Sequence, residues 1–246
     1  METRKVGIML SELSSGSLPV LFRAAGLDFF ILDCEHGGFD YGAVSRIVLS
    51  ARLCGITCIV RLADNGRKDI QKFMDMGADG LLLPMTNDAS EIMQVVKYAK
   101  YRPVGERGIS TMRAHTLYAP PPIAEYVREA NAHTRVYAQI ETARGADNIA
   151  RILSVQGVDG CFVGPNDLSD DLGCLGQAHA RPVLDVIAVV GEAAAQKKKS
   201  AGIITSDAAY LSAAKDAGFS FFCRGSELNA VREYCRSAVK DICGGK

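Results

Sequence analysis

The chain has 246 residues, of which 48% are hydrophobic, with 24 glycines and 8 prolines, a composition that supports a large core and excludes disordered and fibrous proteins. Lys plus Arg equals Asp plus Glu at 28 each, so no net charge attracts nucleic acid or a membrane surface, and we expect a small-molecule partner. No stretch approaches the roughly 18 apolar residues of a membrane span, and no apolar signal segment begins the chain. We therefore expect a cytoplasmic protein whose eight cysteines are reduced thiols.

Short runs rich in Val, Ile, Leu and Phe alternate with longer amphipathic segments, a pattern typical of buried parallel strands covered by helices. The runs that we expect to form strands are residues 6–10, 29–33, 56–61, 80–84, 136–141, 159–164, 201–205 and 221–224. Helical patterns cover residues 17–26, 41–54, 68–76, 89–100 and 208–217, and a last helix is expected over 226–242. Eight such units in roughly 250 residues predict an α/β fold, a (β/α)8 TIM barrel, forming one domain over residues 1–246.

One connection is unusually long. Residues 101–135 contain a run of three prolines, Pro120 to Pro122, and a short helical pattern. Long loops in compact domains are usually functional or mobile. We expect this segment to form part of the active-site rim.

Carboxylates follow two neighbouring predicted strands. Chemistry in TIM barrels takes place at the C-terminal ends of the strands, where Glu141 and Asp167 lie in this chain. Two hard oxygen ligands from adjacent strand ends are suited to one Mg²⁺-like ion, with other positions left for water and substrate. Asp167 could instead cap the following helix. The pair favours a metal site.

Two further strand ends carry polar residues. His36 lies three residues beyond Asp33, near enough for that carboxylate to hold one imidazole nitrogen and leave the other as an acid or base. The alternative is a partly buried histidine without a catalytic role. Arg61 ends an apolar run and needs an anionic partner, which is either a substrate oxyanion or a salt bridge to Glu35 or Asp64.

The segment after the sixth strand begins with Gly164 and Pro165. Glycine lets the backbone turn close to a ligand. The free N–H groups of Asn166 and Asp167 are then suited to binding a carboxylate.

Several of these stretches match one family in order and spacing. They are residues 30–38, 60–61, 77–85, 102–108, 139–141 and 158–169. On these motifs the chain resembles the HpcH/HpaI aldolase family, whose known members include class II pyruvate aldolases acting on 4-hydroxy-2-oxoheptanedioate and on 2-keto-3-deoxy sugar acids.

The resemblance implies a set of ligands. Glu141 and Asp167 would bind Mg²⁺, Mn²⁺ or Co²⁺, which pyruvate would chelate through its keto and carboxylate oxygens. Arg61 would hold the enolate oxygen, the amides of Asn166 and Asp167 would hold the carboxylate, and Gln139 would be a nearby polar contact.

It also implies a reaction. His36, supported by Asp33, would move the proton while a 4-hydroxy-2-oxoacid is cleaved reversibly to pyruvate and an aldehyde. The family tends to form homohexamers whose C-terminal helices are exchanged between subunits, so a neighbouring chain would complete the site.

Other activities remain open. The same site would serve a metal-dependent oxaloacetate decarboxylase or another pyruvate-enolate enzyme, and a non-catalytic 2-oxoacid-binding protein is a further alternative. A CoA-thioester lyase is disfavoured because no basic cluster is present to hold nucleotide phosphates. No strand end carries a lysine, which argues against a Schiff-base aldolase. We interpret Cys34 as a packing thiol.

Overall fold

The computed structural model of the chain describes residues 4–244. Eight parallel strands close into one barrel in sequence order, with β8 paired to β1, so the predicted TIM barrel is confirmed. The strands are β1 (Lys5–Leu10), β2 (Phe29–Asp33), β3 (Thr57–Arg61), β4 (Gly80–Leu83), β5 (Arg135–Ile140), β6 (Gly160–Val163), β7 (Ser200–Ile204) and β8 (Phe221–Ser226). Each lies within two residues of the run that predicted it.

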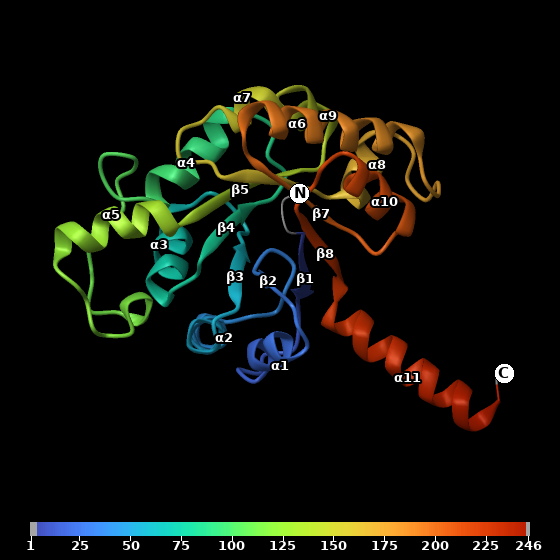
Figure 1. The fold of residues 1–246 in the computed structure, drawn as a ribbon, viewed down its shortest axis with the longest axis horizontal. Coiled ribbons are helices and arrows are strands. Elements are labelled where there is room, and N and C mark those ends of the chain that lie inside the picture. Colours follow the sequence, from blue (N-terminus) through green and yellow to red (C-terminus); the bar gives the residue numbers. More distant parts are fainter. Residues whose placement is uncertain (1–3, 245–246) are drawn as a thin grey trace.

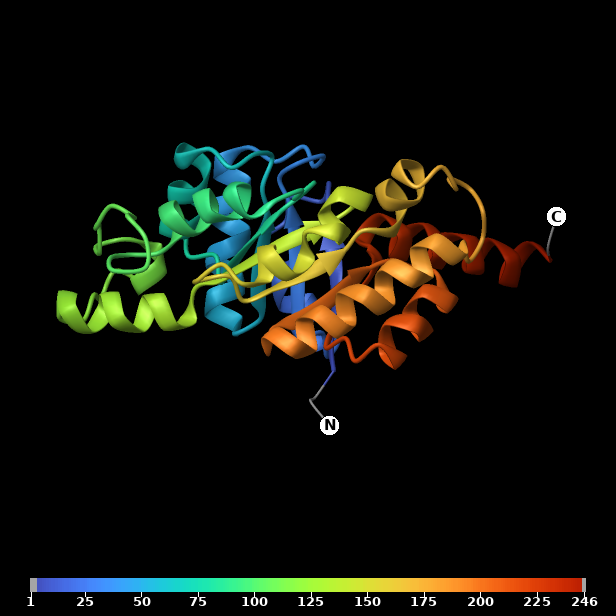
Figure 2. The ribbon, with the colours of Figure 1, turned by 90° about the horizontal axis from the view of Figure 1, so that it is seen from above.

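Helices cover the outside of the barrel, as Figures 1 and 2 show. They are α1 (Leu18–Ala24), α2 (Tyr41–Cys54), α3 (Arg67–Met76), α4 (Ala89–Ala99), α5 (Ile123–His133), α6 (Ala143–Asp147), α7 (Ile149–Leu153), α8 (Pro165–Asp171), α9 (Arg181–Lys197), α10 (Ala208–Asp216) and α11 (Glu227–Cys243), with a 3-10 turn η1 (Ala114–Thr116). The main apolar core lies between these helices and the sheet.

Aromatic rings fill the interior of the barrel. Phe29, Phe162 and Phe221 pack with ring centroids 5.4 to 6.3 Å apart. Two glycines make room for them, because a Cβ at Gly7 would lie 2.6 Å from the ring of Phe29 and a Cβ at Gly202 would lie 2.5 Å from that of Phe162. The barrel is therefore a packed core, and a substrate site belongs at one of its ends.

The long segment before β5 lies at the opposite end of the barrel from the predicted site. Arg107 donates to the carboxylate of Asp75, near the end of α3, with 2.7 Å between Nη2 and Oδ1. His115 Nδ1 lies 3.2 Å from the carbonyl oxygen of the same residue. Since α3 ends where the chain enters the start of β4, these contacts hold the segment beside the beginnings of the strands. The expectation that it forms the rim of the chain's own active site is wrong.

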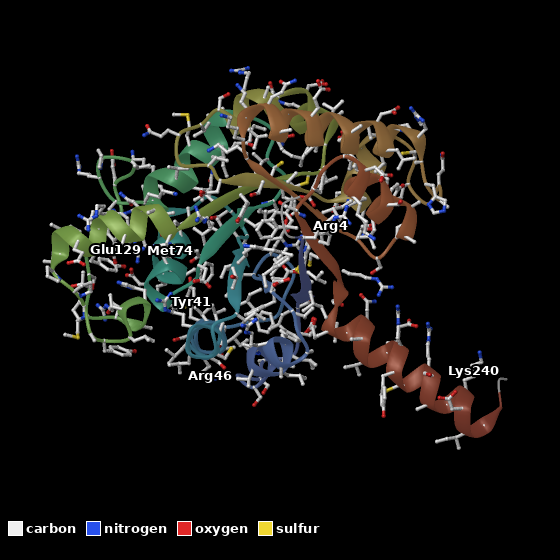
Figure 3. All side chains as sticks on the ribbon, viewed as in Figure 1. Arg4, Tyr41, Arg46, Met74, Glu129 and Lys240 are labelled. Atoms are coloured by element: carbon white, nitrogen blue, oxygen red, sulfur yellow. The ribbon has the colours of Figure 1, made fainter. Side chains whose placement is uncertain are left out.

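The last helix, α11, projects away from the barrel at the end of the molecule opposite α5 (Figures 1 and 2). Of its described residues Glu227 is the buried one. Its other side chains extend outward, including that of Lys240 (Figure 3). Within residues 4–244 no helix is long and apolar enough to cross a membrane.

Candidate active site

Asp33 and Arg61 form an ion pair at the ends of two neighbouring strands. They are register partners in β2 and β3, and both are buried. Arg61 donates to the carboxylate of Asp33 twice, from Nε at 3.0 Å and from Nη2 at 2.7 Å. Burial raises the pKa of Asp33, but the hydrogen bonds and charge of Arg61 outweigh it and hold that pKa below its ordinary value. The structural salt bridge considered for Arg61 is therefore present, to the predicted partner Glu35 and also to Asp33, which had not been named as a partner.

The side chain of His36 lies beside Glu35 and not beside Asp33. Asp33 Oδ1 accepts the backbone N–H groups of Glu35 and His36, at 3.1 and 3.2 Å. The imidazole itself is 74% exposed, and its Nε2 lies 3.8 Å from Glu35 Oε2. The expected Asp33–His36 side-chain pair is thus corrected, because the acceptor sites of Asp33 are taken by Arg61 and by the backbone of the turn.

Glu35 connects several charged groups. Its carboxylate lies 3.1 Å from Nη1 of Arg61. Burial raises the pKa of Glu35, Arg61 and His36 lower it, and the negative charges of Asp33 and Asp167 raise it again. The sequence named Glu35 solely as a salt-bridge candidate, since an acidic residue next to a histidine is too common a pattern to indicate a role.

Glu141 is buried directly after β5. Its Oε2 accepts the backbone N–H of Met85 at 2.9 Å, and its Oε1 accepts Nε2 of Gln139 at 2.6 Å. Burial, together with the negative charge of Asp167 and against the opposing hydrogen bond from Met85, raises the pKa of Glu141 to about 7. Met85 itself has φ 47°, a backbone strain of the kind that gathers at functional sites. The sequence placed Met85 at the end of a family-like stretch, residues 77–85, but indicated no role for it.

Gly164 makes the space that Glu141 occupies. A Cβ at this position would lie 2.4 Å from Glu141 Oε1 and 3.0 Å from Nε2 of Gln139. Gly164 is also the N-cap of α8, followed by Pro165 in its first turn. Asp167 therefore lies inside the first turn of α8, and the alternative that it is the capping residue is excluded.

The donor atoms fit a hard divalent cation. The carboxylates of Glu141 and Asp167 are close enough for the charge of one to raise the pKa of the other. The Oε1 of Gln139 is buried without a hydrogen-bond partner. Carboxylate and amide oxygens are the ligands that Mg²⁺ prefers, together with water. Among residues 4–244 no group of three or more His, Cys, Asp or Glu side chains could jointly hold a metal ion.

Cys34 lies between Asp33 and Glu35 in the sequence. Burial raises the pKa of its thiol to about 12, helped by the charges of Asp33 and Asp69. A thiol that stays protonated is a poor nucleophile, which is consistent with a packing role.

A model of one protein family, described as HpcH/HpaI aldolase/citrate lyase, matches residues 11–233. The chain belongs to the HpcH/HpaI aldolase/citrate lyase family. The family predicted from the sequence motifs is thereby confirmed, and so is the broad class of the protein, because the family is one of aldolases and lyases.

Relatives within the HpcH/HpaI family match nearly the whole chain. The 5-keto-4-deoxy-D-glucarate aldolase of Escherichia coli O139:H28 (strain E24377A / ETEC) is 30% identical over 222 residues, covering 90% of this chain and 86% of the relative. The crystal structure of an HpcH/HpaI aldolase from Desulfitobacterium hafniense DCB-2 superposes with a TM-score of 0.94 at 33% identity, covering 99% of this chain and 94% of that one.

A more distant structure shares the fold alone. Protein CitE from Mycobacterium tuberculosis, in complex with magnesium and pyruvate, has a TM-score of 0.58 at 21% identity and covers 90% of this chain and 85% of its own. This likeness extends the barrel fold beyond the relatives within the family.

Proposed function

We propose that this single barrel domain is a divalent-metal-dependent, class II aldolase that cleaves a 4-hydroxy-2-oxoacid reversibly to pyruvate and an aldehyde. The observation that carries the proposal is the buried Glu141 carboxylate directly after β5, at the same barrel end as Arg61 and His36 and near enough to Asp167 for the charge of Asp167 to raise the pKa of Glu141. The name of the Escherichia coli relative and the magnesium and pyruvate bound to CitE support the class of reaction and of substrate.

Glu141 and Asp167 would hold the cation, which is Mg²⁺, Mn²⁺ or Co²⁺. When bound, it would supply a Lewis acid that favours negative charge on the oxygens of a 2-oxoacid. The buried position of Glu141 fits this role, because an ionised carboxylate in an apolar setting is costly unless a cation lies nearby.

Arg61 would bind the keto oxygen of the substrate, where negative charge develops as the enolate forms. Its guanidinium is oriented in advance by Asp33 and Glu35. A guanidinium that is held in this way loses less rotamer freedom when it binds the substrate.

The first turn of α8 would bind the substrate carboxylate. The leading N–H groups of a helix have no partner within the helix, and here Gly164 and Pro165 bring those of Asn166 and Asp167 to the end of the barrel. Gln139 would add a polar contact through its unpartnered Oε1.

His36 would move the proton. In the cleavage direction its imidazole takes the proton of the C4 hydroxyl, the C3–C4 bond breaks to leave the aldehyde, and the electron pair remains as pyruvate enolate. The protonated imidazole would then return this proton to C3, which completes pyruvate and restores His36. Glu35 is the nearer carboxylate to the ring and is suited to orienting it.

The deciding experiment is a coupled pyruvate-release assay with a panel of 4-hydroxy-2-oxoacids and with oxaloacetate, using Mg²⁺, Mn²⁺, Co²⁺ and a chelator. We expect aldol cleavage that depends on added metal. Undiminished cleavage after verified metal removal would overturn the metal assignment. Turnover of oxaloacetate with none of the hydroxy-oxoacids would instead identify a decarboxylase.

The outer side chains of α11 favour a homo-oligomer, with the hexamer as the family expectation. Leu228, Val231, Cys235, Ala238 and Ile242 follow the alternating three- and four-residue spacing of a helix-packing seam, and none of them is buried. A second copy of this chain would cover them. Light scattering after size exclusion tests this, and a monomeric full-length protein would contradict it.

A further inference from the structure

The first residue of α11, Glu227, holds the loop that follows β1. Oε1 of Glu227 accepts the backbone N–H groups of Ser11, Glu12 and Leu13, at 3.0, 2.7 and 3.2 Å. Residue Glu227 is 3% exposed. One carboxylate oxygen thus fixes three consecutive amides at the end of the barrel where the proposed site lies.

The same loop contacts the turn that carries His36. A Cβ at Gly37 would lie 2.6 Å from the carbonyl oxygen of Ser11, and closer still to that of Asp33. The β1 exit loop and the turn over residues 34–38 therefore pack backbone to backbone at Gly37. A shift of the loop would move this turn.

The hydrogen bonds of the Glu227 side chain all go to one oxygen. The other oxygen, Oε2, is buried and has no hydrogen-bond partner. A buried polar side chain is costly unless hydrogen bonds compensate it. The three amides supply that compensation at Oε1, so the position of the side chain and the loop conformation depend on each other.

We propose that Glu227 is a positioning residue: its carboxylate ties the first turn of α11 to the β1 exit loop, and through Ser11 and Gly37 it holds the turn of His36. The expected effect on rate rests on the proposed function, whereas the hydrogen bonds between Glu227 and residues 11–13 do not depend on it. The remainder of α11 extends away from the barrel (Figure 3), so the contacts of its first turn set the direction of the helix.

The test compares three variants in the full-length protein. Glu227→Ala removes the carboxylate, Glu227→Asp keeps the charge but shortens the reach, and Glu227→Gln keeps an acceptor oxygen at the same reach. Glu192→Ala, an exposed glutamate on α9, is the matched control. Hydrogen–deuterium exchange is followed in peptides covering residues 11–13 and 34–38, beside kcat, KM and Mn²⁺ binding.

We expect Glu227→Ala and Glu227→Asp to exchange faster in both segments. Their kcat should fall by roughly tenfold to a hundredfold, the scale of a catalytic group misplaced by about 1 Å, while KM and Mn²⁺ affinity stay unchanged. Glu227→Gln should recover most of the rate, and Glu192→Ala should match the wild type. If Glu227→Ala fails to fold, the Asp and Gln variants give the same comparison.

If folded Glu227→Asp showed the same rate of hydrogen–deuterium exchange over residues 34–38 as the wild type, the claim that Glu227 holds this turn would be wrong. Loss of Mn²⁺ binding in parallel with rate would also overturn it, because that result indicates a general collapse of the site. A wild-type protein that cleaves no oxoacid would refute the proposed function instead, and the exchange measurements would still decide the tie.

Discussion

The imidazole of His36 and the carboxylate of Glu35 are neighbours at the mouth of the barrel, with 3.8 Å between Nε2 and Oε2. The same carboxylate lies 3.1 Å from Nη1 of Arg61. A single acidic side chain therefore lies beside both the imidazole and the guanidinium that the proposed reaction uses.

Replacing Glu35 with Gln should lower kcat by roughly tenfold and change KM little, because the ring and the guanidinium lose their shared anionic partner. Pyruvate release at saturating metal measures this. Glu106→Gln, which alters an exposed ion pair with Lys97, is the control and should behave as the wild type. A fully active Glu35→Gln protein would remove Glu35 from the mechanism.

Replacing Glu141 or Asp167 with Ala should abolish metal binding and activity together, since each supplies one of the two carboxylate ligands. His36→Ala should retain the metal while losing rate. Titration with Mn²⁺ followed by electron paramagnetic resonance separates the two effects. Asp170→Asn, an exposed change on the same helix as Asp167, should keep both properties. Normal Mn²⁺ affinity in Glu141→Ala would contradict the ligand assignment.

Gly164→Ala should displace Glu141 without removing it. The new Cβ would lie 2.4 Å from Glu141 Oε1 and 2.9 Å from its Cγ, an overpacking that costs about 1–3 kcal/mol of stability. We expect weaker Mn²⁺ binding and a lower Tm. In Gly16→Ala the nearest atom would be 3.8 Å away, so this variant should leave both quantities unchanged. Equal results for the two variants would show that Gly164 is not required for the site.

The stability of the fold should fall as the pH drops below about 6.5, through His115. Burial lowers the pKa of His115, and the nearby charges of Arg107 and Arg52 lower it further against the opposing effect of Asp75. The unfolded chain then binds a proton that the folded chain rejects, which destabilises the fold between pH 6.5 and the lower folded pKa. Each unit of pKa difference is worth about 1.4 kcal/mol.

Urea unfolding at pH 5.5 and at pH 7.5 measures this dependence. His115→Gln should reduce the difference in free energy of unfolding between the two pH values, and the exposed His133→Gln should preserve it. The ring of Tyr126 packs on His115, with centroids 5.4 Å apart, so absolute stability is expected to change as well. An unchanged pH difference in His115→Gln would exclude His115 as its source.

The sequence by itself determined the barrel and the positions of its strand ends, because buried parallel strands require continuous apolar runs and the polar residue that follows a run marks where the strand leaves the core. Asp33, Arg61, Glu141 and Asp167 were found in this way. Hydrophobic patterning predicts which residues are buried, and this prediction does not require knowing which side chains contact one another.

Only the tertiary structure decided which of these groups touch. In the structure Asp33 pairs with Arg61, and Glu35 lies beside His36. The segment over residues 101–135 lies at the opposite end of the barrel from these groups. The structure also connects Glu227 to Ser11, 216 positions away in the chain. Such pairings depend on side-chain reach and on competition among several acceptors for the same donors, and neither is encoded in the periodicity of a single strand or helix.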